Sequence, residues 1–105
     1  MVRKRSGRLE PFDPAKLRRG LEAALADRPV AAGAIDELIA GIDAHVTDAT
    51  VPVDSEQIGR MVLEALRALD EVAYLRFASV YQDFQGLSDF EQALADLEDP
   101  VTAAE

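Results

Sequence analysis

The sequence contains no cysteine, which excludes several classes of site at once. Disulfides, thiolate zinc sites, iron–sulfur clusters and cysteine nucleophiles all need this residue. His45 is the single histidine, so a zinc site is not expected either. No apolar run approaches the roughly 20 residues of a membrane span, and the basic N-terminus continues into a polar turn instead of the apolar stretch of a signal peptide. We therefore expect a soluble, cytoplasmic protein.

The net charge of −9 is distributed unevenly along the chain. Residues 1–19 contain seven of the eleven basic residues and only two acidic ones, whereas the remainder is strongly acidic. An acidic chain repels the phosphates of nucleic acids, while a compact basic patch suits a small anion. Most of the acidic side chains are expected to lie on solvated helix faces.

Caps and apolar periodicity predict a single α-rich domain with a small N-terminal sheet. The expected strands are 2–5 and 8–12, joined by a two-residue turn at Ser6-Gly7, and 50–53 at a sheet edge. The expected helices are 14–28, 32–48, 55–69, 70–85 and 88–98, the last opening with a capping box at Ser88. The predicted fold is α+β, mostly α: four or five bundled helices capped by a three-stranded β-sheet, over residues 2–98, with a flexible tail at 99–105.

The two-residue turn determines which hairpin residues face each other. It places Lys4 opposite Leu9, and Arg5 opposite Arg8, and directly opposed residues share one face of the ribbon. Lys4, Leu9 and Val2 would then form one face, with Arg8 on the other. If the first face covers the helices, Lys4 points into a semi-enclosed space, where its ammonium group calls for an anion.

A second cation lies at an unusual position on the first expected helix. Lys16 is in the first turn, where the helix dipole disfavours a cation by about a few tenths of a kcal/mol. A phosphate bound there would reverse that cost, so Lys4, Arg5 and Lys16 could converge on one polyphosphate. The alternative, from the residues alone, is that all three are solvated surface charges. Because no P-loop pattern is present, nucleotide would be bound without hydrolysis.

Two stretches resemble known families. Residues 2–17, from Val2 through the Lys16-Leu17 pair, look like the opening of the ATP-cone family, whose domains are allosteric nucleotide sensors in ribonucleotide reductases and related proteins. Residues 69–84, together with 28–30, are similar to a narrower group, the NrdR family of bacterial repressors of ribonucleotide reductase genes. The resemblance extends over residues 2–98.

The resemblance implies a domain that senses ATP and dATP, is not an enzyme, and regulates ribonucleotide reductase genes as part of a transcriptional repressor. The residues that it implies at the phosphates are Lys4, Arg5 and Lys16. Those that it implies near the base or ribose are Val2, Glu10 and Ser55. Two of these have alternatives, since Ser55 suits a helix N-cap and Glu10 could merely pair with Arg3.

The resemblance also implies a homo-oligomer whose size depends on the bound nucleotide. Three aromatic residues of the fourth expected helix, Phe77, Tyr81 and Phe84, offer more apolar area than a small core needs, and aromatic residues are enriched at interfaces. They are candidates for a subunit contact.

One departure from the repressor family concerns DNA. Its members carry an N-terminal zinc ribbon with four cysteines that binds DNA, and this chain has no cysteine. The chain would be part of a longer repressor, the product of an internal start, or a free-standing cone, and alone it is not expected to bind DNA specifically. Two other hypotheses remain: an ATP-cone fragment of a ribonucleotide reductase, and an acidic helical protein-interaction module. Four cysteines encoded upstream would indicate the repressor, and absence of nucleotide binding would favour the interaction module.

Overall fold

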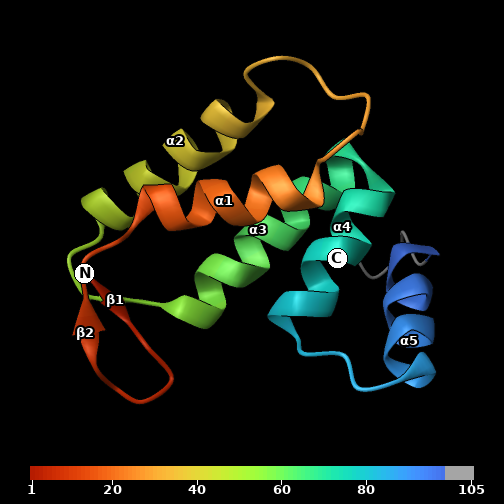
Figure 1. Cartoon of the computed structure of the whole chain (residues 1–105). Coiled ribbons are helices and arrows are strands. Elements are labelled where there is room, and N and C mark those ends of the chain that lie inside the picture. Colours follow the sequence, from red (N-terminus) through yellow and green to blue (C-terminus); the bar gives the residue numbers. More distant parts are fainter. Residues whose placement is uncertain (99–105) are drawn as a thin grey trace.

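The computed structural model describes residues 1–98, and within that range five helices accompany one small sheet (Figure 1). The helices are α1 (Pro14–Ala24), α2 (Ala34–Asp48), α3 (Ser55–Leu69), α4 (Glu71–Tyr81) and α5 (Leu87–Glu98). The strands are β1 (Val2–Arg3), β2 (Leu9–Glu10) and β3 (Val53–Asp54). This confirms the predicted α+β, mostly helical fold. The predicted flexible tail at 99–105 lies outside the described residues.

The sheet has the order β2-β1-β3, with β1 in the centre. β1 pairs with β2 in antiparallel fashion and with β3 in parallel fashion, so α1 and α2 form the crossover between the parallel strands. Val2 lies opposite Val53, and both side chains are buried against the helices. The third strand is at a sheet edge, as predicted, although its two residues begin later than the expected segment 50–53.

The hairpin turn has three residues instead of the expected two. The Lys4 N–H donates to the Arg8 carbonyl at 2.8 Å, and the Gly7 N–H donates to the Lys4 carbonyl at 2.8 Å. Gly7 has a φ of +89°, the left-handed conformation that ends a three-residue loop. A two-residue turn would require positive φ at its first central residue, which Ser6 disfavours and glycine tolerates.

The longer turn shifts the hairpin register by one residue. Val2 pairs with Glu10 and Arg3 pairs with Leu9, so the predicted pairing of Lys4 with Leu9 is wrong. Glu10 takes the place expected for Leu9 on the face shared by Val2 and Lys4, and the Leu9 side chain is 46% exposed. Arg8 lies directly opposite Lys4, whose N–H donates to the Arg8 carbonyl, so the two residues share one face of the hairpin. The two-residue turn predicts Arg8 on the other face, and that prediction is also wrong.

Two helices begin at a capping carboxylate, that of Asp13 as predicted and that of Asp70. The Asp13 carboxylate accepts a hydrogen bond from the Lys16 N–H at 3.1 Å, with Pro14 at the first helical position. The Asp70 carboxylate accepts from the Ala73 N–H at 3.0 Å at the start of α4. Such carboxylates satisfy backbone donors that the first helical turn leaves without partners.

Several helix boundaries differ from the prediction, among them the end of α4, which is Tyr81 and not residue 85. α1 ends at Ala24, before the expected stop at residue 28, and the chain turns through Asp27 with a φ of +59°. α5 begins at Leu87, so Ser88 lies inside the helix and the expected capping box does not form. The Asp89 carboxylate instead accepts from the Gln85 N–H at 2.8 Å, outside the helix.

The core lies where α1, α2 and α3 meet the sheet. Leu21, Val62 and Leu66 are its largest fully buried side chains, and α1 lies between α2 on one side and α3 and α4 on the other (Figure 1). α5 packs against α4, at the end of the molecule far from the hairpin (Figure 1). There Phe84 meets Phe90 edge-on, with ring centroids 4.8 Å apart, so this aromatic residue is used within the chain. Within residues 1–98, no helix has both the length and the apolar character that a membrane crossing requires.

Candidate functional site

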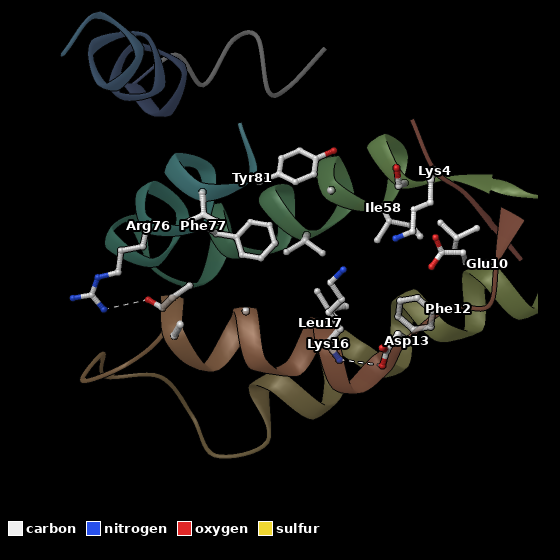
Figure 2. A pocket seen from close by; sticks show the side chains of 18 of the residues that line it. Lys4, Glu10, Phe12, Asp13, Lys16, Leu17, Ile58, Arg76, Phe77 and Tyr81 are labelled. Carbon is white, nitrogen blue, oxygen red and sulfur yellow. Dashed lines mark hydrogen bonds between the residues drawn. The ribbon is translucent and has the colours of Figure 1, made fainter. Parts of the chain in front are cut away.

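A cavity of about 730 Å³ lies between the hairpin, α1, α3 and α4 (Figure 2). Pockets for small-molecule ligands typically have volumes of roughly 300–1,000 Å³. Its apolar walls come from all of these elements and include Phe12, Leu17, Ile58, Val62 and Phe77. Small residues of α1, Gly20 and Ala23, also line the cavity.

Charged and polar side chains gather at the end of this cavity next to the sheet. Figure 2 shows the side chains of Lys4, Glu10 and Lys16 extending into the same space from the hairpin and from the first turn of α1. Five of the six site residues predicted from the sequence line the cavity: Val2, Lys4, Glu10, Lys16 and Ser55. These residues are separated by up to about half of the chain, and the sheet and the start of α3 bring them together.

Glu10 is held as a carboxylate by its neighbours. Arg8 donates to its Oε2 from Nη2 at 2.8 Å and from Nε at 3.1 Å. This hydrogen bonding from Arg8, with the charges of Lys4 and Lys16 nearby, holds the pKa of Glu10 below its ordinary value. Glu10 therefore faces the cavity as a hydrogen-bond acceptor at neutral pH. Its predicted alternative partner, Arg3, instead pairs with Asp54 of β3 at 3.5 Å.

The two lysines of the cavity face two carboxylates. Asp13, which caps α1 through the Lys16 N–H, lines the same end of the cavity as Glu10. The positive charges of Lys4 and Lys16 are thus partly offset before any ligand arrives. Among residues 1–98, no group of three or more histidine, cysteine and acidic residues gathers in a way that could hold a metal ion.

Arg5, the sixth predicted residue, lies outside the large cavity. Its Nε is 3.6 Å from Oε1 of Glu56, and its guanidinium carbon is 5.9 Å from the centre of the Tyr81 ring. It borders a second cavity of about 240 Å³, whose lining is Arg3, Lys4, Arg5, Gly7, Asp54, Ser55 and Glu56. Of the three cations predicted at a polyphosphate, the two lysines therefore line the large cavity, and Arg5 lies beside it.

Tyr81 forms a wall of the large cavity in a way that the sequence analysis missed. Its ring lies directly against Gly59 of α3, where a Cβ atom would collide with the ring, and its hydroxyl donates to the Glu56 carbonyl at 3.2 Å. Phe77 stacks beside it, with ring centroids 6.1 Å apart. The available signal was a glycine inside a strongly amphipathic helix, which points to a close approach by another group.

Arg76 closes the far end of the cavity. Its Nη1 donates to the carbonyl groups of Ala24 at 3.3 Å and of Ala26 at 2.8 Å, and Figure 2 shows it at the opposite end from the lysines. These carbonyls belong to the last residue of α1 and to the turn just after it, so a cation there also suits the negative end of the helix dipole. The arginine thereby fixes α4 to the end of α1.

Comparison with known proteins yields a domain family and a group of relatives. Residues 1–87 match the ATP cone domain family, so most of α5 lies beyond the matched range. Similar curated proteins include the transcriptional repressor NrdR of Xanthobacter autotrophicus, 46% identical over 98% of this chain and 57% of the relative, and that of Methylobacterium sp. strain 4-46, 48% identical over 91% and 52%. The transcriptional repressor NrdR of Bartonella henselae is 42% identical over 100% of this chain and 66% of its own length. The chain thus spans about half to two thirds of the length of these relatives.

Proposed function

The chain belongs to the ATP-cone domain family, and from this membership we propose that its large cavity binds ATP and dATP as regulatory signals. The observation that carries the proposal is the construction of the cavity, apolar along its length and lined by two lysines at one end. An adenosine group fits the apolar part, and anionic phosphates fit the lysine end, where charge-assisted hydrogen bonds are strong.

Each residue of the polar end has a role in this proposal. Lys4 and Lys16 hold phosphates, and Val2 and Ser55 lie beside the base or the ribose. Glu10, an ionised acceptor, is suited to accept a hydrogen bond from a ribose hydroxyl. The 2′-hydroxyl is the only chemical difference between ATP and dATP, so Glu10 is the residue to test for discrimination between them.

We further propose that the domain acts as part of a transcriptional repressor of ribonucleotide reductase genes in the bacterial cytoplasm. The support is similarity to several transcriptional repressors named NrdR over nearly all of this chain. This similarity favours a repressor over a fragment of the reductase itself. In the proposal, DNA is contacted by a zinc ribbon outside this chain, and the ATP-cone supplies the nucleotide dependence.

The direct test is calorimetric titration of the protein with ATP and dATP, combined with thermal melting. A ligand present at 100 times its dissociation constant stabilises the fold by about 2.7 kcal/mol. Cytidine triphosphate serves as a control for the base, because it carries the same phosphates. Melting that is unchanged at millimolar ATP and dATP would refute the proposal and favour a protein-interaction module.

The proposed sensor does not consume its ligand. The sequence lacks a P-loop to position magnesium and water at the terminal phosphate. We expect no phosphate release when purified protein is incubated with ATP and magnesium. Release that is abolished by Lys4→Ala would show instead that the cavity is catalytic.

A further inference from the structure

The outer face of the sheet is basic and partly apolar. Arg3 and Leu9 lie directly opposite each other on β1 and β2, so their side chains share one face, and Met1 falls on that face by the alternation of the strand. All three side chains are exposed, whereas Val2, on the other face, is buried. Residues 1–9 contain four basic residues and no acidic one. We call Met1, Arg3 and Leu9 the hairpin face.

Helix α5 exposes a stripe of the opposite charge. Leu87, Glu91, Leu94 and Glu98 follow one another at i, i+4, i+7 and i+11, which places them on one side of the helix, and all four side chains are exposed. From residue 77 to residue 98 the sequence has five acidic residues and neither lysine nor arginine. We call these four residues the α5 stripe.

The α5 stripe has no part in the large or the small cavity, because the residues that line them all precede α5. Most of α5 also lies beyond the range that matches the ATP cone domain family. The helix is thus an addition to the part of the chain that builds the cavities, packed against α4 with two leucines exposed. Apolar side chains that are exposed together and rimmed by charges mark protein contact surfaces.

Charge decides which surface the α5 stripe fits. Two α5 stripes facing each other would bring Glu91 and Glu98 of one copy against those of the other, and two hairpin faces would bring arginines together. Like charges repel across an interface, so both symmetric pairings are disfavoured. The hairpin face offers the complement, apolar side chains beside a cation. Arg3 is available for this contact because its ion pair with Asp54, at 3.5 Å, is exposed and therefore weak.

We propose that the hairpin face of one copy binds the α5 stripe of a second copy. The leucines of the stripe cover Leu9 and Met1, and its carboxylates accept hydrogen bonds from Arg3. The two surfaces lie at opposite ends of the molecule (Figure 1), so one copy cannot make the contact with itself. A pair of copies therefore leaves one hairpin face and one α5 stripe free, and further copies add until a ring closes or a filament forms. The contact does not depend on the proposed nucleotide binding.

The test measures the mass of the protein by sedimentation, without nucleotide and over a wide range of protein concentration. The mass should rise with concentration and fall as salt is added, because salt screens the ionic part of the contact. Leu9→Glu and Leu94→Glu should each weaken self-association roughly ten- to a hundredfold, since each places an unpaired carboxylate against the apolar part. Ala44→Glu, at an exposed position of α2, adds the same charge outside both surfaces and should leave the masses unchanged.

Mixing the two variants distinguishes this contact from a symmetric one. Leu9→Glu keeps an intact α5 stripe and Leu94→Glu keeps an intact hairpin face. An equimolar mixture should therefore form pairs, and nothing larger, at concentrations where each variant alone is monomeric. A symmetric contact through either surface would leave one variant fully associated, and that result overturns the proposal. A mixture that stays monomeric overturns it as well.

A wild-type protein that remains monomeric at every concentration, with and without ATP, also overturns the proposal and leaves a basic segment of another protein as the occupant of the α5 stripe. ATP affinity is measured in parallel by calorimetry. Neither Leu9 nor Leu94 lines a cavity, so both variants should bind ATP with unchanged affinity. If the wild-type protein associates but does not bind ATP, the proposed function fails and this contact stands. Circular dichroism confirms folding, and Leu87→Glu or Arg3→Glu replaces a variant of the same surface that does not fold.

Discussion

Lys4 and Lys16 reach one end of the large cavity from different elements, which makes each separately testable. Lys4→Ala or Lys16→Ala should weaken ATP binding about ten- to a hundredfold, because each removes a charge-assisted hydrogen bond to phosphate. Isothermal titration measures the loss, and melting in the absence of nucleotide should change little, since Lys16 is exposed and Lys4 only half-buried.

Arg19→Ala provides the control for this pair. Arg19 is an exposed cation of α1, one turn after Lys16, and lines neither cavity. Its removal changes the net charge by the same amount, so ATP affinity should fall less than in Lys16→Ala. Equal losses would mean that the lysines act only through the general field of the protein.

Gly59 is the residue at which the wall of the large cavity is most sensitive to a single methyl group. In Gly59→Ala the new Cβ collides with the Tyr81 ring, and overpacking of this kind costs about 1–3 kcal/mol. That cost exceeds the gain of up to about 1 kcal/mol in helix propensity. We expect a lower melting temperature and weaker ATP binding, measured by circular dichroism and calorimetry.

Gly41→Ala is the matched comparison for that variant. Gly41 lies inside α2, and a Cβ there would meet nothing within 4 Å. The substitution should stabilise the protein by about 0.5–1 kcal/mol and leave ATP affinity unchanged. If Gly59→Ala stabilised the protein as much as Gly41→Ala, the Tyr81 ring would not pack tightly against Gly59 of α3 in solution.

At the scale of elements, Asp70 joins three segments. Its carboxylate caps α4 and accepts hydrogen bonds from Arg28 Nε, at 2.9 Å to one oxygen and 3.0 Å to the other, which ties the segment after α1 to the junction of α3 and α4. The hydrogen bond from the Ala73 N–H, aided by Arg28, lowers the pKa of Asp70 below its ordinary value of 3.8. The stabilisation is therefore complete above that value and is lost as the pH falls through the lower pKa of the folded state.

Asp70→Asn should isolate the contribution of the charge. Asparagine also caps helices, but it cannot form the ion pair with Arg28. We expect the variant to melt below the wild type at pH 7, and the difference to shrink as the pH falls below about 4. Asp43→Asn, at an exposed position of α2, should show no such convergence. A difference that stays constant down to pH 3 would mean that the Asp70 charge contributes nothing.

Local signals predicted most elements, and the hairpin shows where they were misread. The Asp13-Pro14 start was predictable because a cap acts within one helical turn, whereas the start of α4 was predicted only as lying near Asp70. The predicted hairpin register is off by one residue, because a Ser6-Gly7 pair suggests a two-residue turn. In the structure, Gly7 supplies the single positive φ that a three-residue turn needs. Likewise, Ser88 suited a cap, but the helix starts one residue earlier.

The candidate site was predictable in part, for a different reason. Lys4, Glu10 and Lys16 fall in one short N-terminal segment, so motif and resemblance sufficed to group them. The separation of Arg5 into a second cavity depends on its contacts with Glu56 and Tyr81, which are far away in the sequence. No local pattern encodes such contacts.

At the scale of the whole molecule, we expect nucleotide to change the state of assembly. Phe77 and Tyr81, which are candidates for a subunit contact, also line the large cavity, so a ligand there would contact side chains of α4. Exposed apolar residues remain on α4 and α5, among them Val80 at 83% and Leu87 at 73%. A ligand shifts an assembly equilibrium only through different affinities for the two states.

Light scattering of the protein alone, with ATP and with dATP tests this expectation, and three identical masses would contradict it. A gel-shift assay at moderate salt accompanies it. We expect no specific shift from this chain, because its net charge is −9 and the basic hairpin is assigned to nucleotide. A specific shift would mean that the hairpin contacts DNA.

The parallel pairing of β1 with β3 has a consequence for the newborn chain. The hairpin is synthesised first, but the strand that completes its sheet follows only after α1 and α2. At about 5–20 residues per second, translation separates the two partners by roughly 3 to 10 seconds. Bringing such distant segments together carries a closure entropy that local helices do not incur, so we expect the helices to form before the sheet. A polypeptide still on the ribosome, with α3 not yet released, lacks one wall of the large cavity, so under the proposed function it cannot yet bind nucleotide.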